Sequence, residues 1–230
     1  MPRKLNQSQN ALAKRIRTIY PNFRATRALY IDLEGWRNQN TAVSMYWPMN
    51  AGPKRFSFAI ASAKNEMLQA HHLETCLREL GNGAENPEHI VVYSGGGQDP
   101  DEKHRLVASI QYDPWPDTEW VNLLYAVRQT RQMTKSITAS RYAIKKENIK
   151  AKNSLENLER EFGIKRNPEH RAFNNTYADG LKGTMQVTKL IRKFQNQQIS
   201  NTEYKALIEY CRLDVKSMFD IARACEKYAN

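Results

Sequence analysis

The sequence predicts an α/β fold in which a mixed sheet carries helices on both faces. Three observations support this prediction. Residues 28–61 contain three successive strand-like segments, and residues 89–93 form a short, continuously apolar run of the kind found in buried parallel strands. Amphipathic helical segments lie between and after these strands. A chain of 230 residues is long enough to bury one proper core, so we expect a single main domain.

The first half of the chain alternates between helix and strand signals. Residues 8–19 have apolar side chains at helical spacing, and Pro21 ends that pattern. Strands are then expected over residues 28–34, 41–48 and 55–61, with turn residues at 50–53. Short connections between neighbouring strands favour an antiparallel arrangement, so these three strands predict a meander.

The second half supplies the remaining helices and the parallel part of the sheet. An amphipathic helix is expected over 63–80, closed by the glycines at 81 and 83, before the parallel strand at 89–93. The later elements are expected in this order: a helix from Pro100, a strand or short helix over 120–128, a helix over 155–162 closed by Gly163, and a long helix over 202–228.

The chain is strongly basic, with 35 Lys and Arg against 24 Asp and Glu and a formal net charge of +11. Such an excess favours an anionic partner, and we expect nucleic acid, either DNA or RNA. Residues 128–152 hold eight Lys or Arg and one acid, Glu147. This stretch is either a solvated or disordered arm, or an insertion that contacts phosphates. The expected nucleic-acid-binding side chains are Arg128, Arg131, Lys135, Arg141, Lys145 and Lys146.

Domain organisation and compartment follow from the same composition. We expect a basic N-terminal helical extension over residues 1–27 and one domain over 28–230 that carries the basic insertion. The three cysteines are far apart and form no CxxC pair, so neither a disulfide framework nor a zinc site is expected. Neither a signal peptide nor a run of 18 apolar residues is present. The sequence therefore predicts a cytoplasmic protein without a membrane partner.

The strand at 28–34 carries two acids on one face. Side chains alternate along a strand, so Asp32 and Glu34 point one way while Leu29, Ile31 and Leu33 point the other. Two neighbouring carboxylates repel each other and resist burial. Either this face is wet and the acids contact water, or a divalent cation such as Mg²⁺ lies between them.

The long C-terminal helix carries an acid in its apolar stripe. At 100° per residue, with Leu207 at zero, Cys211 and Met218 fall within about 40° of that direction. Asp214 falls near −20°, inside the stripe, whereas Asp220 falls near 220°, on the polar face. Charged side chains are seldom buried alone, so Asp214 must pair with a basic residue or bind a metal ion.

A further acid follows the parallel strand at 89–93. Asp99 is a suitable N-cap for the helix from Pro100, and Glu102 would complete a capping box. Glu102 also precedes Leu106 by one turn, on the face expected to meet the sheet, which makes it the best candidate for an inward acid. Asp101 and Asp99 are the alternatives. The glycines at 95–97 are expected to form a flexible, substrate-facing loop.

Taken in order, these motifs resemble the DEDD exonucleases of the tyrosine type. The resemblance covers roughly residues 27–228 and includes Asp32-x-Glu34, Val91-Val92-Tyr93-Ser94 with the acid at Glu102, and Tyr210-x-x-x-Asp214. The local sequence is most similar to the YprB-like branch found in bacteria. Such a resemblance implies a ribonuclease H-like fold and a nuclease that hydrolyses phosphodiester bonds, most simply a 3′-5′ exonuclease.

The resemblance also implies roles for individual residues. Asp32, Glu34, Glu102 and Asp214 match the acids that bind two Mg²⁺ or Mn²⁺ ions, and Tyr210 matches the tyrosine that orients or deprotonates the attacking water. In such sites the two ions lie about 3.5–4 Å apart. The chain departs from the pattern at Asn122, where related chains often carry aspartate, and in the Gly-rich insertion before the fourth acid. A degenerate nucleic-acid-binding subunit of a larger complex and an endonuclease of the same fold therefore remain open alternatives.

Overall fold

The computed structural model describes residues 5–36, 39–50, 54–64, 66–81, 83–144, 154–165 and 180–228. Within them, a five-stranded sheet has the order β3-β2-β1-β4-β5. The first three strands form the antiparallel meander, and β4 pairs parallel to both β1 and β5. The strands are β1 (Ala28–Trp36), β2 (Gln39–Tyr46), β3 (Phe56–Ile60), β4 (His89–Val92) and β5 (Glu119–Asn122). The prediction of a mixed sheet is confirmed.

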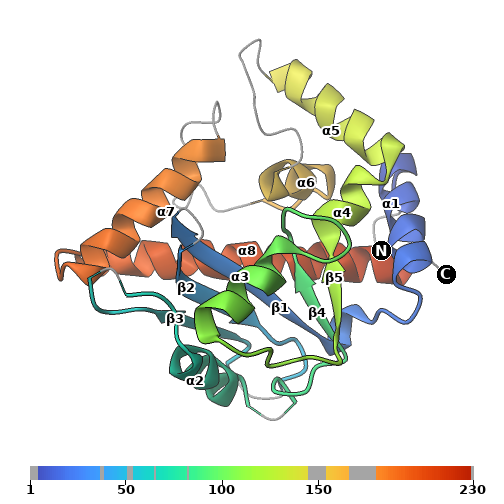
Figure 1. The fold of residues 1–230 in the computed structure, drawn as a ribbon. Helices are drawn as coiled ribbons and strands as arrows, with labels where there is room; N and C mark the ends of the chain where they lie inside the picture. The colour runs from blue at the N-terminus through green and yellow to red at the C-terminus, as the bar shows by residue number, and fades with distance from the viewer. Residues whose placement is uncertain are drawn as a thin grey trace.

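Helices cover both faces of this sheet (Figure 1). Helices α2 (Ala70–Leu80) and α3 (Asp101–Ile110) pack on one face, and the long helix α8 (Asn201–Tyr228) crosses the other. Five further helices accompany α8: α1 (Gln7–Ile19), α4 (Leu123–Arg128), α5 (Arg131–Ile144), α6 (Leu155–Glu161) and α7 (Gly180–Gln195). A 3₁₀ turn over Ala25–Arg27 leads into β1. The fold is therefore α/β with a mixed sheet between two helical layers.

The central strand β1 separates two apolar cores. Leu29, Ile31 and Leu33 are buried in the core beneath α2 and α3. On the opposite face, the ring of Tyr30 packs edge-on against Phe219 of α8, with 5.5 Å between the ring centroids. Since side chains alternate along a strand, the next residues on the α8 face are the two acids of β1. This alternation places the side chains of the two acids at the interface between β1 and α8.

Helix α1 and the first part of the basic segment belong to the same core as α8. Leu12 and Ile16 of α1 are buried in one cluster with Met218 of α8. Met133 and Ile137 of α5 are buried in that cluster as well. The basic segment is therefore anchored to the domain over its first helix, whereas residues 145–153 lie outside the described part of the chain.

Two sequence predictions of helices need correction. Helix α2 begins at Ala70 and not at residue 63. The preceding segment runs beside β2, where the Leu68 amide donates to the Asn40 carbonyl oxygen at 2.8 Å and the Leu68 side chain is buried. Backbone groups committed to a neighbouring strand cannot close helical hydrogen bonds. Helix α7 is absent from the sequence-based prediction, although Val187, Leu190 and Ile191 have helical spacing and are buried.

The other predicted helices are confirmed within a few residues. The ambiguous stretch 120–128 contains both of the elements considered, strand β5 followed by helix α4. Gly163, after α6, has a φ of 69°, a conformation that explains the glycine at that helix end. Cys76, Cys211 and Cys225 are free and buried. Among the described helices, none is long and apolar enough to cross a membrane.

Candidate metal centre

Three acids that are far apart in the sequence converge between β1 and α8. Asp32, Glu34 and Asp214 each offer a carboxylate oxygen, and these oxygens lie within 4.8 Å of one another. Asp214 is only 8% exposed, and the two β1 acids are half-buried. We call these three residues the acid cluster. Carboxylate oxygens at this spacing can bind a divalent cation.

The rotation of α8 explains why Asp214 belongs to the cluster and Asp220 does not. Asp214 is buried on the same side of the helix as Cys211 and Met218, as the helical spacing predicts. Asp220 lies on the outer side, where its carboxylate accepts a hydrogen bond from the Lys216 ammonium group one turn earlier. The distinction between an inward and an outward acid on this helix is thus confirmed.

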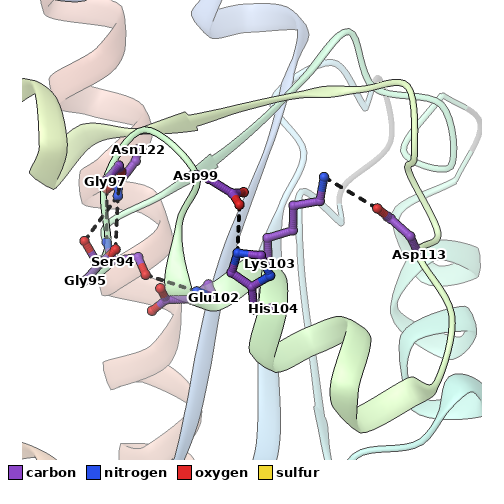
Figure 2. Close-up of polar contacts among 9 residues, drawn as sticks. All are labelled: Ser94, Gly95, Gly97, Asp99, Glu102, Lys103, His104, Asp113 and Asn122. Carbon is purple, nitrogen blue, oxygen red and sulfur yellow. Dashed lines mark hydrogen bonds and ion pairs between the residues drawn. The ribbon is translucent and has the colours of Figure 1, made fainter.

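A fourth carboxylate, Glu102, lies in the first turn of α3 and is directed inward. Its side chain is 8% exposed, and its Oε2 atom has no hydrogen-bond partner within the described ranges of the chain. Burial, and next the negative charge of Asp32, raise the pKa of Glu102 to about 8. The alternatives Asp99 and Asp101 are both exposed, and Asp99 accepts a 2.7 Å hydrogen bond from His104 (Figure 2). Glu102 is therefore the acid best placed to complete the cluster.

The cap of α3 differs from the one predicted. Pro100 stands at the N-cap, and Asp99 makes no capping hydrogen bond because it binds His104 instead. The Ser94 hydroxyl supplies the missing acceptor, since the Glu102 amide donates to its Oγ at 3.0 Å. The prediction of Asp99 and Glu102 as a capping box is thus wrong. The hydrogen bond to the Ser94 hydroxyl instead holds the backbone of Glu102 in place.

The acids of the cluster act on one another electrostatically. Burial raises the pKa of Glu34 well above its usual value, and the charges of Asp32 and Asp214 raise it further. Arg105 lowers the pKa of both Glu34 and Glu102, yet within the described residues it forms no ion pair, and its buried Nε has no hydrogen-bond partner. The orphaned Oε2 of Glu102 and the close spacing of the three cluster carboxylates both fit a site for a divalent metal ion.

Asn122 has a structural role that the sequence did not reveal. Its side chain is fully buried, and its Nδ2 donates to the carbonyl oxygens of Ser94, Gly95 and Gly97 at 2.9–3.3 Å (Figure 2). Its Oδ1 accepts from the Ser94 amide and from the first amides of α4. Asn122 thus holds the Gly-rich loop and, through Ser94, the start of α3. An aspartate would lose every one of the donated bonds.

We therefore expect Asn122→Asp to lower the free energy of unfolding by about 3 kcal/mol or more, because a buried carboxylate would face three carbonyl oxygens. Urea unfolding at pH 8 measures this change. Asn10→Asp is the matched control, since the Asn10 amide makes a single exposed hydrogen bond to the Leu5 carbonyl oxygen. The control should lose less than about 1 kcal/mol. Equal losses in the two variants would contradict the assigned role of Asn122.

The loop itself needs glycine at position 96, and the glycine at position 95 leaves room for a neighbouring side chain. A Cβ atom at Gly95 would collide with the carboxylate of Asp101, and Gly96 has a φ of 77°. Asp101 therefore packs against the loop and not against the acid cluster. The sequence predicted a flexible loop here, whereas Asn122 holds the loop by three hydrogen bonds.

The remaining predicted site residues lie in two groups. Tyr210 is half-buried on α8, one turn before Asp214. Arg128, Arg131 and Lys135 are exposed, and the Arg128 Nη1 donates to the Gly96 carbonyl oxygen at 3.5 Å. Arg141 belongs to α5, while Lys145 and Lys146 lie outside the described residues. The structure thus brings Asp32, Glu34 and Asp214 together, and it leaves the basic side chains of the second group that it describes on the surface.

Comparisons with known proteins identify no relative of this chain. It matches no protein-family model, no curated protein and no solved structure. The function must therefore be argued from the site itself.

Proposed function

We propose that this protein is a metal-dependent nuclease of the DEDD type, with a ribonuclease H-like fold, that hydrolyses phosphodiester bonds in DNA or RNA. The observation that carries the proposal is the convergence of Asp32, Glu34 and Asp214 close to Glu102, whose buried Oε2 atom has no hydrogen-bond partner among the described residues. The order of the elements supports it as well, since an antiparallel meander is followed by parallel strands and a late helix that brings an acid to β1.

Each side chain has a distinct role in this proposal. Asp32, Glu34 and Asp214 would hold Mg²⁺ or Mn²⁺, and Glu102 would complete the ligand set. Bound divalent ions supply Lewis-acid stabilisation of the phosphate charge and lower the pKa of a bound water molecule. Tyr210, one turn before Asp214, would orient the attacking water. Exposed cations such as Arg128 would bind the polyanion that the acidic centre repels.

The proposed polarity is 3′ to 5′, as the resemblance implies. An assay with end-labelled linear and covalently circular substrates, with Mn²⁺ or with EDTA, tests both the activity and the mode of attack. We expect stepwise shortening of the linear substrate only when Mn²⁺ is present. Cleavage of the circular substrate would indicate an endonuclease. Tight binding without any cleavage would indicate a nucleic-acid-binding subunit.

The exposed cations of α5 are expected to contribute to binding through phosphate contacts. The double variant Arg131→Ala with Lys135→Ala should make the negative slope of log binding constant against log salt concentration shallower by about 1.5. Each lost phosphate contact lowers the magnitude of that slope by about 0.7–0.9. Fluorescence anisotropy with a labelled oligonucleotide, between low and physiological salt, measures the slope. The experiment is done in EDTA so that hydrolysis does not interfere.

Arg78→Ala combined with Lys205→Ala removes the same charge from exposed positions on α2 and on the first turns of α8. The slope of this control should stay within about 0.5 of the parent value, because neither side chain lies on α5. If the two double variants lower the slope equally, the α5 cations act only through net charge.

A further inference from the structure

Helix α3 carries a basic side chain next to the candidate metal centre. Arg105 follows Glu102 by three residues, which places the two side chains on the same face of the helix. The Arg105 side chain is half-buried, and its Nε atom is buried without a hydrogen-bond partner among the described residues. Buried donors are normally paired with an acceptor. Arg105 is therefore a candidate to bind a ligand that brings its own acceptor.

The backbone of α3 at Arg105 is fixed to the sheet. Asn40 of β2 is fully buried, and its Nδ2 atom donates to the Arg105 carbonyl oxygen at 2.8 Å. The same nitrogen donates to the Ser109 Oγ at 2.9 Å. These contacts hold the helix turn from which the Arg105 side chain extends. Since side chains on a helix lean toward its N-terminus, the guanidinium group is directed back to the first turn, where Glu102 lies.

The charge of Arg105 acts on acids from two elements. Burial raises the pKa of Glu34 on β1 and of Glu102 on α3, and the positive charge of Arg105 lowers both. Such an influence falls with distance, so the guanidinium group lies near both carboxylates. Within the described part of the chain, however, Arg105 forms no ion pair with either of them. The donors of its guanidinium group are therefore available to a third partner.

The chemistry of the proposed site indicates which partner this is. A guanidinium group presents five N–H donors in a planar fork, which matches the oxygens of a phosphate. Divalent ions held by the acid cluster would bring the phosphate of a nucleic-acid strand to the same place. Hydrogen-bond donors fixed at a reacting phosphate stabilise the charge of the transition state. Arg105 has the position and the donors for this role.

We propose that Arg105 binds a non-bridging oxygen of the substrate phosphate beside the metal ions and stabilises the charge that develops there during hydrolysis. This role rests on the proposed nuclease function and adds a residue outside the acid motif. Arg105 makes and breaks no covalent bond in this role and transfers no proton. The alternative role is to offset the charge of Glu34 and Glu102 without touching the substrate. The two roles differ in their effect on nucleotide binding.

Isothermal titration calorimetry with two probes tests the proposal. Mn²⁺ alone is titrated first, and a mononucleotide is then titrated at saturating Mn²⁺. The mononucleotide is adenosine or deoxyadenosine 5′-monophosphate, whichever the parent protein binds more tightly. Arg105→Gln should bind Mn²⁺ at least as tightly as the parent, because a positive charge near the acids is removed. Its affinity for the nucleotide should fall at least about tenfold, because a charge-assisted contact is lost.

Lys103→Gln is the matched control, since it removes the same charge from the same helix. The Lys103 ammonium group pairs with Asp113 at 3.5 Å and points away from Glu102 (Figure 2). The nucleotide affinity of this control should change less than about threefold. Arg105→Lys keeps the charge and loses the planar fork, so its nucleotide affinity should lie between those of the parent and Arg105→Gln. Circular dichroism establishes that the variants are folded. If Arg105→Gln does not fold, an unchanged nucleotide affinity of Arg105→Lys overturns the proposal.

The other outcomes separate the role of Arg105 from the function on which it rests. No Mn²⁺ binding by the parent protein would overturn the proposed metal centre, and the role of Arg105 with it. Mn²⁺ binding without nucleotide binding, or equal nucleotide affinities of Arg105→Gln and Lys103→Gln, would overturn the role of Arg105 alone. Loss of Mn²⁺ affinity in Arg105→Gln would show that Arg105 supports the metal centre itself, and would also overturn the proposed phosphate contact.

Discussion

Asp32→Asn is expected to abolish phosphodiester hydrolysis while nucleic-acid binding stays intact or becomes tighter. Asp32 contributes to the acid cluster, and its charge also acts on both Glu34 and Glu102. Loss of this carboxylate weakens the binding of the ions that stabilise the transition state. That loss amounts to about 4 kcal/mol, or about three powers of ten in rate. Tighter binding would follow from removing one negative charge that faces the polyanion.

Two variants of α8 form a matched pair, because each removes one negative charge from the same helix but from opposite sides of it. Asp214→Asn should be as inactive as Asp32→Asn, whereas Asp220→Asn should retain the parent activity because Asp220 pairs with Lys216 on the outer side of the helix. Single-turnover assays with saturating enzyme measure the rates, and anisotropy in EDTA measures the binding. Retained cleavage by Asp32→Asn would remove the nuclease assignment from this site. Equal effects at residues 214 and 220 would contradict the conclusion that the inward position of Asp214 on α8 is what matters for activity.

Divalent cations are expected to stabilise the protein much more at pH 8.5 than at pH 5.5. The pKa of Glu102 is raised from an ordinary value of 4.5 to about 8, and that of Glu34 is raised well above its usual value. In the metal-free protein, the stability contributed by these protonated groups is present below about pH 4.5 and is lost as the pH rises through about 8. Metal ions bind the ionised carboxylates and must displace these protons, so their effect grows with pH.

Thermal unfolding with and without Mn²⁺ or Mg²⁺ at the two pH values measures this coupling. An ion at about one hundred times its Kd contributes about 2.7 kcal/mol, which corresponds to an increase in Tm of roughly 5–10 °C for a chain of this size. At pH 5.5 the increase should be less than half as large. Glu102→Gln should reduce the difference between the two pH values, because one of the competing protons is gone. An equal increase at both pH values, or none at either, would contradict metal binding at the acid cluster.

The strands and the inward acids were predictable because short-range patterns determine them. Alternation along β1 separates Leu29, Ile31 and Leu33 from Asp32 and Glu34, and a rotation of 100° per residue separates Asp214 from Asp220. Both arguments use only the positions of residues within a single strand or helix. They survive in the folded protein because the apolar side chains of both elements are buried in core clusters.

The features that the sequence did not reveal depend on contacts between distant segments. Asn122 acts on a loop more than twenty residues earlier in the chain, and Ser94 caps a helix that begins seven residues later, at Asp101. Local rules assigned that cap to Asp99, which the structure pairs with His104. The start of α2 was misplaced for the same reason, since the backbone of Leu68 bonds to β2.

Because β1 and α8 lie at opposite ends of the chain, the acid cluster exists only after the last helix has docked. A nascent chain that lacks α8 presents Asp32 and Glu34 without their third ligand, so it should bind divalent ions weakly. Affinity for Mn²⁺ would then report that α8 has docked against β1, and under the proposed nuclease function a prematurely terminated chain would lack hydrolytic activity.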